Sequence, residues 1–360
     1  MKKVLIIINT SFVPYGGITT VVMNYYRKID KSNVQIDIAS TNEVGNQLKE
    51  EISKYSTNYY NLGKRKKVFH YTKKIKKLIE ENKYDVVHVN GNSATMFLDL
   101  FPAKSKKVPL RIAHVHNSKS QHPRLNKFLK LYFKKTYNFA IAVSKLSGDW
   151  LYGDNYTVLN NAIDVEYYSY NTDIRKQKRE ELGLLDDEFV IGTVGKLNEQ
   201  KNHEFLLRVF ESVHKVNEKS KLIIVGGGDL EKNLRQLAKD LSIDDSVIFT
   251  GMVDDSRDYY QAFDFFALPS RYEGFGLSLV EAQSAGLKCV ASIYVPDEAN
   301  ASRSVEFLDI KENYQEWADF ILNNCHYDRE AMALNAAKSI RKNGYDIGHE
   351  AKKLLEIYNS

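Results

Sequence analysis

The stretch from Leu268 to Ala282 constrains the fold most, because it joins a buried strand, a glycine loop and a helix in one short run. The apolar run 263–268 predicts a parallel strand, and the helix is predicted to begin near Leu277. Gly274 and Gly276 let the backbone approach a ligand closely, while the helix start directs N–H groups and partial positive charge toward the same place. This stretch therefore predicts a phosphate-binding site in an α/β protein.

Two carboxylates flank the glycine loop, eight positions apart in the sequence. Glu273 precedes the glycines, and Glu281 lies about one turn into the predicted helix. Both could accept hydrogen bonds from hydroxyls beside a phosphate, which favours a nucleotide sugar as the ligand. A strand, glycine loop and helix alone would be weak evidence, because many doubly wound proteins bind some phosphate in this way.

The spacing of Glu273 and Glu281, with Gly-Phe-Gly-Leu directly after the first and Ala after the second, resembles the donor motif of the retaining family 4 glycosyltransferases. That resemblance covers nearly the whole chain and is strongest over residues 195–285. It implies the GT-B fold, in which two Rossmann-like, doubly wound α/β domains face a central cleft. The resemblance implies an N-terminal acceptor-binding domain (residues 1–167) and a C-terminal nucleotide-sugar-binding domain (168–345). It also implies a C-terminal helix (346–360) that crosses back to the first domain.

Composition fits a two-domain globular protein. The chain has 360 residues, of which 43% are hydrophobic, and this is enough for two cores. Two cysteines exclude a disulfide framework and favour a reducing cytoplasm. The apolar run 4–8 is too short for a signal peptide, and no window approaches the roughly 20 apolar residues of a spanning helix. We expect a cytoplasmic protein, either in solution or peripheral on the inner face of the plasma membrane.

Charge is divided unevenly along the sequence. Residues 1–170 contain 27 Lys and Arg against 13 Asp and Glu, and the rest contains 24 against 33. Within the basic half, the segment 127–135 alternates lysines with aromatic and aliphatic residues, which suits a helix on anionic lipid. Packing of its apolar side on its own domain stays an equal alternative. Nucleic acid is not expected as a partner, because no binding module accompanies the charge.

The first domain carries two further candidate features. Gly16 and Gly17 stand where a helix is predicted to begin, as a simple turn or as contacts to a phosphate; the resemblance favours the donor diphosphate. His116 follows the predicted strand 110–115 and alternates with His114. A lone histidine there would be structural as often as functional, but the resemblance places the imidazole of His116 beside the transferred sugar. His88, inside another predicted strand, is expected to be a core residue.

In the second domain, cations and glycines follow the predicted strands. Lys196 and Lys201 come after the strand 189–194, and two cations there can neutralise the charge on a departing diphosphate. Lys196 stands where the family usually has Arg, so it lacks the bidentate fork. The resemblance assigns Gly227 to the phosphates and ribose, and Met252 with Val253 to the base; as isolated features they would be tight turns. The polar stretch 168–187 is the favoured linker.

The resemblance implies a metal-independent, retaining hexosyltransferase that needs no cofactor. The donor is a nucleotide-diphosphate sugar, with a UDP-sugar expected, and the acceptor is a glycan or polyprenyl-diphosphate-linked hydroxyl in capsule or exopolysaccharide synthesis. The expected catalytic residues are His116, Lys201 and Glu273. The expected donor-binding residues are Gly16, Gly17, Lys196, Gly227, Met252, Val253, Gly274, Phe275, Gly276, Leu277 and Glu281.

Two alternatives stay open at this point. One is a GT-B nucleotide-sugar epimerase or hydrolase, which would turn over its donor without an acceptor. The other is a non-catalytic GT-B protein that binds a polysaccharide or a membrane. The presence of Glu273, Glu281, Lys201 and His116 together argues against the second, because a site without a catalytic role needs none of them.

Overall fold

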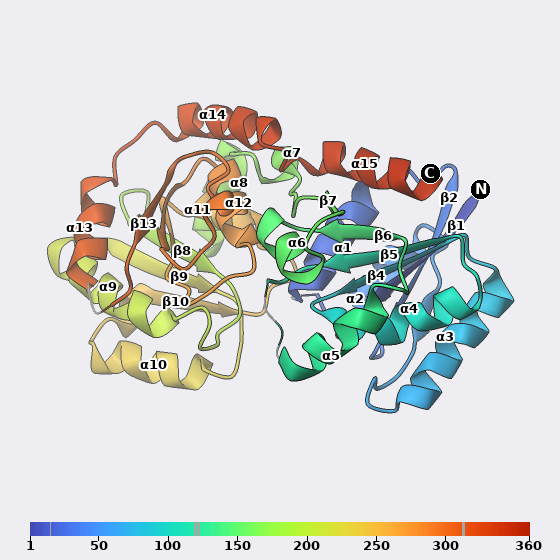
Figure 1. Cartoon of the computed structure of the whole chain (residues 1–360). Helices are drawn as coiled ribbons and strands as arrows, with labels where there is room; N and C mark the ends of the chain where they lie inside the picture. Colours follow the sequence, from blue (N-terminus) through green and yellow to red (C-terminus); the bar gives the residue numbers. More distant parts are fainter. Residues whose placement is uncertain (15, 119, 121–122, 312–313) are drawn as a thin grey trace. The chain divides into compact units, whose positions relative to one another are not determined.

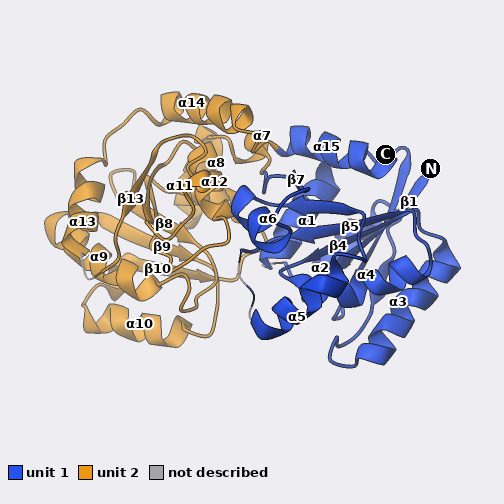
Figure 2. Ribbon diagram, viewed as in Figure 1, with its two compact units in different colours: residues 1–162, 347–360 blue, residues 163–346 orange. Residues whose placement is uncertain are grey.

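The chain divides into two compact units, coloured separately in Figure 2. This computed structural model describes residues 1–14, 16–118, 120, 123–311 and 314–360. Unit 1 consists of residues 1–162 and 347–360, and unit 2 of residues 163–346. Each unit holds one parallel sheet with helices on both faces, as Figure 1 shows. The expected α/β architecture of two Rossmann-like domains is thus confirmed.

Unit 1 contains a seven-stranded sheet in the order β3-β2-β1-β4-β5-β6-β7. The central strands are apolar along their whole length because helices cover both faces. The short strands β3 and β7 lie at the two edges and are only partly buried or exposed, so their sequences lack the apolar signal. Neither strand was predicted from the sequence. The strands are β1 (Lys2–Ile8), β2 (Val34–Ser40), β3 (Tyr59–Asn61), β4 (Val86–Gly91), β5 (Leu110–Val115), β6 (Phe139–Ala142) and β7 (Thr157–Val158).

The helices of unit 1 form two layers. Figure 1 shows α3, α4 and α5 on one face of the sheet, with α1 and α15 on the other. The C-terminal helix α15 therefore packs on α1 within unit 1. The elements are α1 (Gly17–Lys28), α2 (Asn46–Ser53), α3 (Val68–Asn82), η1 (Ala94–Met96), α4 (Phe97–Ser105), α5 (Pro123–Phe133), α6 (Lys145–Leu151) and α15 (Ile347–Asn359).

Unit 2 contains a six-stranded sheet in the order β10-β9-β8-β11-β12-β13. Its strand pairs are parallel, and its two hydrophobic clusters lie on opposite faces of the sheet. The strands are β8 (Phe189–Val194), β9 (Ser220–Val225), β10 (Val247–Gly251), β11 (Phe265–Leu268), β12 (Lys288–Ser292) and β13 (Val305–Leu308).

The stretch 168–187, favoured above as a linker, is mostly helical and belongs to unit 2. Its polar composition misled the prediction, because Arg179 is buried and bonded to backbone carbonyls. The remaining elements of unit 2 are α7 (Val165–Tyr168), α8 (Thr172–Glu181), α9 (His203–Val216), α10 (Glu231–Asp240), η2 (Asp244–Ser246), α11 (Arg257–Ala262), α12 (Leu277–Ser284), η3 (Asp297–Ala299), α13 (Tyr314–Asn323) and α14 (Arg329–Lys342).

The direction of strand addition reverses once in each sheet. In unit 1 the reversal lies between β1 and β4, and in unit 2 between β8 and β11. Loops leaving the carboxyl ends of such neighbouring strands diverge to opposite faces of the sheet, which opens a crevice where ligands bind. The topology therefore predicts a ligand-binding site at each of these two switch points.

Candidate functional site

The switch point of unit 2 is built from two loops that are bonded to each other. The Arg271 amide N–H donates to the Gln200 carbonyl oxygen at 2.7 Å, and the Asn202 side-chain amide donates to the Pro269 carbonyl at 3.2 Å. Asn202 adopts a left-handed conformation (φ 56°) immediately before α9. The loops after β8 and β11 therefore form one platform.

Lys201 and Glu273 form an ion pair on this platform. The Lys201 Nζ lies 2.8 Å from Glu273 Oε1, and the side chains are 16% and 8% exposed. The Ser270 hydroxyl donates to Glu273 Oε1 at 2.7 Å, and the Gln200 amide donates to Oε2 at 3.2 Å. Sequence reasoning paired neither Ser270 nor Gln200 with Glu273, although each adjoins a predicted site residue. The carboxylate is thus fixed by three donors.

A further buried group, His203, lies close to Lys201 at the start of α9. Burial, with the Lys201 charge adding to it, lowers the pKa of His203 to about 3, so the ring is neutral. Its Nδ1 has no hydrogen-bond partner in the part of the chain that the structure describes. The sequence offered no signal for this residue beyond its place after Asn202.

The glycine loop turns sharply into α12. Gly276 precedes the helix in a left-handed conformation (φ 97°), which a residue with a side chain rarely adopts. A Cβ there would also lie 3.3 Å from the Val295 side chain. Gly274 is exposed, Phe275 is buried against Tyr345, and the helix begins at Leu277 as predicted. The helix N-terminus thus opens beside the Lys201 platform.

Glu281 is buried in the second turn of α12. The Tyr260 hydroxyl donates to Glu281 Oε2 at 2.6 Å, and the Tyr168 hydroxyl also bonds this carboxyl group. Burial raises the pKa of Glu281, while the two tyrosine hydroxyls and the Lys201 charge oppose that rise. Neither tyrosine was expected here, because both come from elements far away in the sequence. They hold the carboxyl group in one orientation.

The glycines after β9 pack closely on the loop after β8. A Cβ at Gly226 would lie 2.1 Å from the Gly195 carbonyl oxygen, and one at Gly227 would lie 2.8 Å from Met252 Cγ. This packing is sufficient reason for glycine at both positions. Met252 is 56% exposed, and Lys196 is exposed as well. Their assignment to the donor, with that of Val253, stays a prediction.

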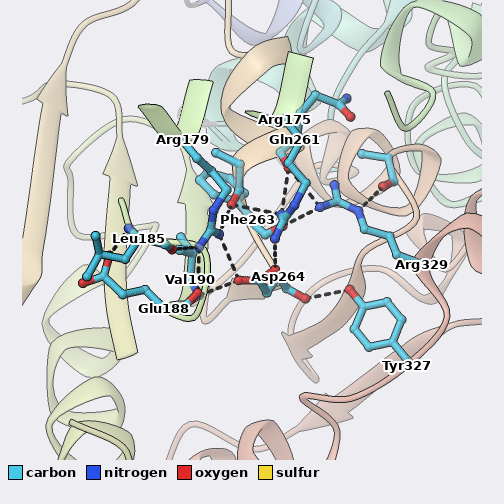
Figure 3. Close-up of polar contacts among 12 residues, drawn as sticks. Arg175, Arg179, Leu185, Glu188, Val190, Gln261, Phe263, Asp264, Tyr327 and Arg329 are labelled. Atoms are coloured by element: carbon cyan, nitrogen blue, oxygen red, sulfur yellow. Dashed lines mark hydrogen bonds and ion pairs between the residues drawn. The ribbon is translucent and has the colours of Figure 1, made fainter. Parts of the chain in front are cut away.

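A cluster of arginines supports the strand that carries the glycine loop, as Figure 3 shows. Arg175 and Arg329 donate to main-chain carbonyls at the end of α11, including that of Phe263, at 2.9 and 2.5 Å. Arg175 and Arg179 also pair with Asp264, at 2.6 and 3.3 Å. Because Asp264 directly precedes β11, these contacts fix the entry of the chain into that strand.

The side chains at the switch point of unit 1 are neutral, although that of Asn9 is hydrogen-bonded to the buried Asp99, which pairs with Arg65. The Asn9 amide N–H donates to the Asn90 carbonyl at 3.1 Å, and a Cβ at Gly91 would lie 2.3 Å from the Asn9 side chain. His116, just after β5, is buried, and its Nε2 lies 2.9 Å from Asn90 Oδ1. Because an amide oxygen only accepts, Nε2 carries the proton and Nδ1 has a free lone pair. Burial lowers the pKa of His116 to about 3.

Two more histidines extend inward from His116. The His114 ring is tilted by 32° against that of His116, with centroids 4.2 Å apart, and its Nδ1 lies 3.2 Å from His88 Nε2. The Tyr358 hydroxyl of α15 lies 2.8 Å from His88 Nδ1. His88 is therefore the core residue that was expected, and His114 joins it there rather than at the sheet edge.

Gly16 and Gly17 lie at the start of α1 in the same unit. A Cβ at Gly16 would come 3.0 Å from the Thr19 hydroxyl, whereas one at Gly17 would meet nothing within 4 Å. Glycine is thus sterically favoured only at the first position. Contact of either residue with a diphosphate stays a prediction.

The structure brings Lys201, Glu273, Gly274–Leu277 and Glu281 together in unit 2, and places His116 and Gly16–Gly17 in unit 1. Within the described residues, no group of three or more histidine, cysteine or carboxylate side chains could hold a metal ion. None of the helices that the structure describes has both the length and the apolarity to cross a bilayer.

Comparison with known proteins identifies both halves of the chain. Residues 15–167 match the family described as "Glycosyltransferase Family 4", and residues 174–339 match "Glycosyl transferases group 1". The chain is 28% identical to "Putative glycosyltransferase EpsF" of Bacillus subtilis, over 96% of this chain and 93% of that protein. It is 29% identical to "UDP-Gal:alpha-D-GlcNAc-diphosphoundecaprenol alpha-1,3-galactosyltransferase" of Escherichia coli, over 78% and 77%.

A solved structure shows the same fold. The Anabaena protein HepE, crystallised with UDP and glucose, has a TM-score of 0.79 and 18% identity, and the match covers 99% of both chains. Such a likeness concerns the fold, while the two family matches concern the sequence. The chain belongs to the glycosyltransferases of the GT-B fold, with a family 4 domain followed by a group 1 domain.

Proposed function

We propose that this glycosyltransferase is a retaining, metal-independent hexosyltransferase that uses a UDP-sugar and acts in surface polysaccharide synthesis. The acceptor is a hydroxyl of a glycan or of a polyprenyl-diphosphate-linked sugar. One observation carries the proposal: the Lys201–Glu273 pair beside the N-terminus of α12, at the switch point of unit 2. The E. coli relative, named for UDP-galactose and a diphosphoundecaprenol acceptor, supports this choice of substrates.

The donor diphosphate binds at Lys201 and the start of α12. A cation and a helix N-terminus both stabilise the negative charge that grows on the leaving UDP. Glu273 accepts hydrogen bonds from hydroxyls of the transferred sugar, and its three protein donors hold it ready for that role. Glu281, held by Tyr260 and Tyr168, binds the ribose hydroxyls. Exposed Lys196 adds a second, more mobile cation.

Transfer then proceeds on one face of the sugar. The bond between the anomeric carbon and the diphosphate oxygen breaks, and the electron pair leaves with UDP. The acceptor hydroxyl attacks from the side that the diphosphate leaves, and its proton passes to the diphosphate. The neutral His116, with its free lone pair on Nδ1, stabilises the positive charge that develops on the sugar.

The neutral edge of unit 1 suits the acceptor. Asn90 and His116 offer amide and imidazole groups, which recognise hydroxyls without attracting a second charged group. We place the enzyme at the inner face of the plasma membrane, because a polyprenyl-linked acceptor is a membrane lipid. The named acceptor of the E. coli relative supports this location.

A panel of nucleotide sugars tests the proposal. We expect one UDP-sugar to raise the melting temperature and to be hydrolysed slowly without acceptor, releasing UDP and a sugar whose first-formed anomer matches that of the donor. Glu273→Ala should lose this turnover but keep UDP binding. Inversion of the anomer, or conversion of the donor into an epimer, would overturn the retaining-transferase assignment.

A further inference from the structure

Most of the exposed aromatic side chains of unit 1 gather on α3, α4 and α5. Of the phenylalanines that the structure describes, Phe69, Phe101 and Phe128 are the exposed ones, and Phe69 is 92% accessible. Single exposed apolar residues are ordinary, but a continuous group on one side of a domain marks an interaction surface. We call this group the aromatic–lysine face; its apolar members are Val68, Phe69, Phe101, Leu125, Phe128, Leu131 and Tyr132.

Ring contacts join the members of α4 and α5 into one layer. The half-buried Phe97 ring lies 5.5 Å from that of Phe101 and 6.3 Å from that of Tyr132. Tyr132 in turn lies 5.6 Å from Phe128. On α3, Lys76 Nζ lies 5.6 Å from the Phe101 ring, and Phe69 is seven residues earlier, on the same stripe of that helix.

The outward direction of α5 is fixed by its inner contacts. Phe133 is the buried residue of the helix, and the Lys130 ammonium donates to the Trp150 carbonyl at 3.0 Å. The Asn126 side chain accepts from the Ala94 amide at 2.8 Å. With the helix anchored in this way, Phe128 and Leu131 must face outward. Phe133 and Leu129 pack α5 on its own domain, whereas Phe128 and Leu131 stay exposed, so the alternative left open by the sequence describes only one side of the helix.

The surroundings of the face are cationic. Residues 100–148 contain no Asp or Glu but eleven Lys and Arg, and residues 52–79 contain no Asp or Glu but nine Lys and Arg. Asp99 of α4 is buried and paired with Arg65, so it presents no charge at the surface. Lys127, Lys134 and Lys135 are exposed on or just after α5. Glu80, Glu81 and Asp149, just outside these segments, pair with Lys106, Lys77 and Lys145. The aromatic–lysine face thus combines apolar side chains with an excess of positive charge, because the remaining cations of the two segments outnumber these three carboxylates.

We propose that the aromatic–lysine face docks on the surface of an anionic lipid bilayer. Phe69, Phe128 and Leu131 enter the boundary between head groups and acyl chains, while the lysines contact lipid phosphates. Aliphatic members such as Val68 and Leu125 favour lipid over nucleic acid, because they cannot stack on bases but gain from leaving water. This inference rests on the membrane location proposed above and names the surface that would bind the membrane. Vesicle binding can be measured without a nucleotide sugar.

Co-sedimentation of the full chain with vesicles tests this surface. We expect binding to vesicles of phosphatidylglycerol and phosphatidylcholine, weaker binding to phosphatidylcholine alone, and release by salt. Phe128→Ser with Leu131→Ser should weaken binding about tenfold or more, since two buried side chains are lost. Lys127→Gln with Lys134→Gln should weaken it and flatten its salt dependence. The control, Val216→Ser with Leu334→Ser, alters side chains of similar exposure (69% and 66%) in unit 2 and should bind like the wild type.

Insertion has a separate readout. Tryptophan at position 128 (Phe128→Trp) should be quenched by brominated lipids, whereas Leu334→Trp should not. The proposal fails if the wild type does not bind anionic vesicles, or if the Phe128/Leu131 variant binds them as tightly as the wild type. It also fails if binding of a single-stranded oligonucleotide depends on Phe128 while vesicle binding does not. Melting temperatures and UDP-sugar hydrolysis of the variants should match the wild type, which separates a failure here from a failure of the proposed function.

Discussion

The two sheets present opposite chemistry at the same topological position. Between β8 and β11, unit 2 holds the ion pair of Lys201 and Glu273. Between β1 and β4, unit 1 holds the amides of Asn9 and Asn90, with the neutral His116 on the adjoining strand end. The ion pair of Arg65 with Asp99 contacts this edge through the Asn9 side chain. The charged edge suits a ligand whose own charge rises during reaction, and the neutral edge suits one recognised by its hydroxyls. Under the proposed function, the charged edge of unit 2 is the donor side and the neutral edge of unit 1 is the acceptor side.

The first and largest effect should be a difference in acid sensitivity. Burial lowers the pKa of His88 and His116 to about 3 and that of His114 well below its usual value. The pKa of these histidines in the unfolded chain is about 6.5. Below that pH the unfolded chain binds protons at the three rings and the folded chain does not, so the free energy of unfolding decreases as pH falls. With three such histidines, the free energy of unfolding of unit 1 should fall by up to roughly 4 kcal/mol per pH unit.

Hydrogen exchange of the sheet amides at pH 7.5 and pH 5 measures this difference. Protection in β4 and β5 should fall more than protection in β8 and β11, where His203 is the comparable group. His114→Gln should reduce the acid sensitivity of unit 1. Equal loss in both sheets would break the comparison.

Removal of one charge from unit 2 should come next in size. Lys201→Met leaves Glu273, which is 8% exposed, without its cation. An unpaired buried carboxylate costs about 3 kcal/mol of unfolding free energy. Adding Glu273→Leu to the same chain should restore most of that loss, because the uncompensated charge disappears. Thermal unfolding of both variants measures these changes in stability. A double variant no more stable than Lys201→Met would contradict the ion pair.

Asn90→Asp should turn the neutral edge of unit 1 into a charged one. A carboxylate 2.9 Å from His116 Nε2 would raise the pKa of that imidazole and keep it protonated over more of the pH range. We expect kcat to fall about tenfold, because an imidazolium no longer stabilises positive charge on the sugar. Asn90→Ala is the control that removes the acceptor without adding charge. A wild-type pH profile for Asn90→Asp would contradict the role given to His116.

The smallest effect should come from Tyr260→Phe. It removes the hydrogen bond at 2.6 Å to Glu281 but keeps the ring in its core position. The loss should be about 1 kcal/mol in stability, with a few-fold weaker UDP binding. Calorimetric titration with UDP measures the second quantity. Tyr259→Phe, at the preceding residue, serves as the matched control.

The sequence predicted the residues that come together in unit 2 better than those that do so in unit 1, for a physical reason. Gly276, Glu273 and Glu281 lie within one continuous strand–loop–helix stretch, so their spacing alone predicts a common site. The partners of these groups, such as Tyr260 and Tyr168, come from elsewhere in the sequence and appear only when the sheet forms.

The acceptor side depends wholly on such distant contacts. Asn90 lies on β4 and His116 just after β5, and neither segment alone shows that the amide sets the tautomer of the imidazole. The short edge strands β3 and β7 and the helical stretch 172–181 were missed because their polar residues hide their role in packing. Apolar pattern predicts the centre of a parallel sheet more readily than its edges.

Isothermal titration with UDP tests the division into donor and acceptor sides most directly. Three proteins are compared: the wild type, Lys201→Ala and His116→Ala. We predict that Lys201→Ala weakens UDP binding at least tenfold, since a charge-assisted contact is lost, and that His116→Ala leaves it unchanged. UDP binding that depends on His116 as strongly as on Lys201, or that ignores Lys201, would contradict the division.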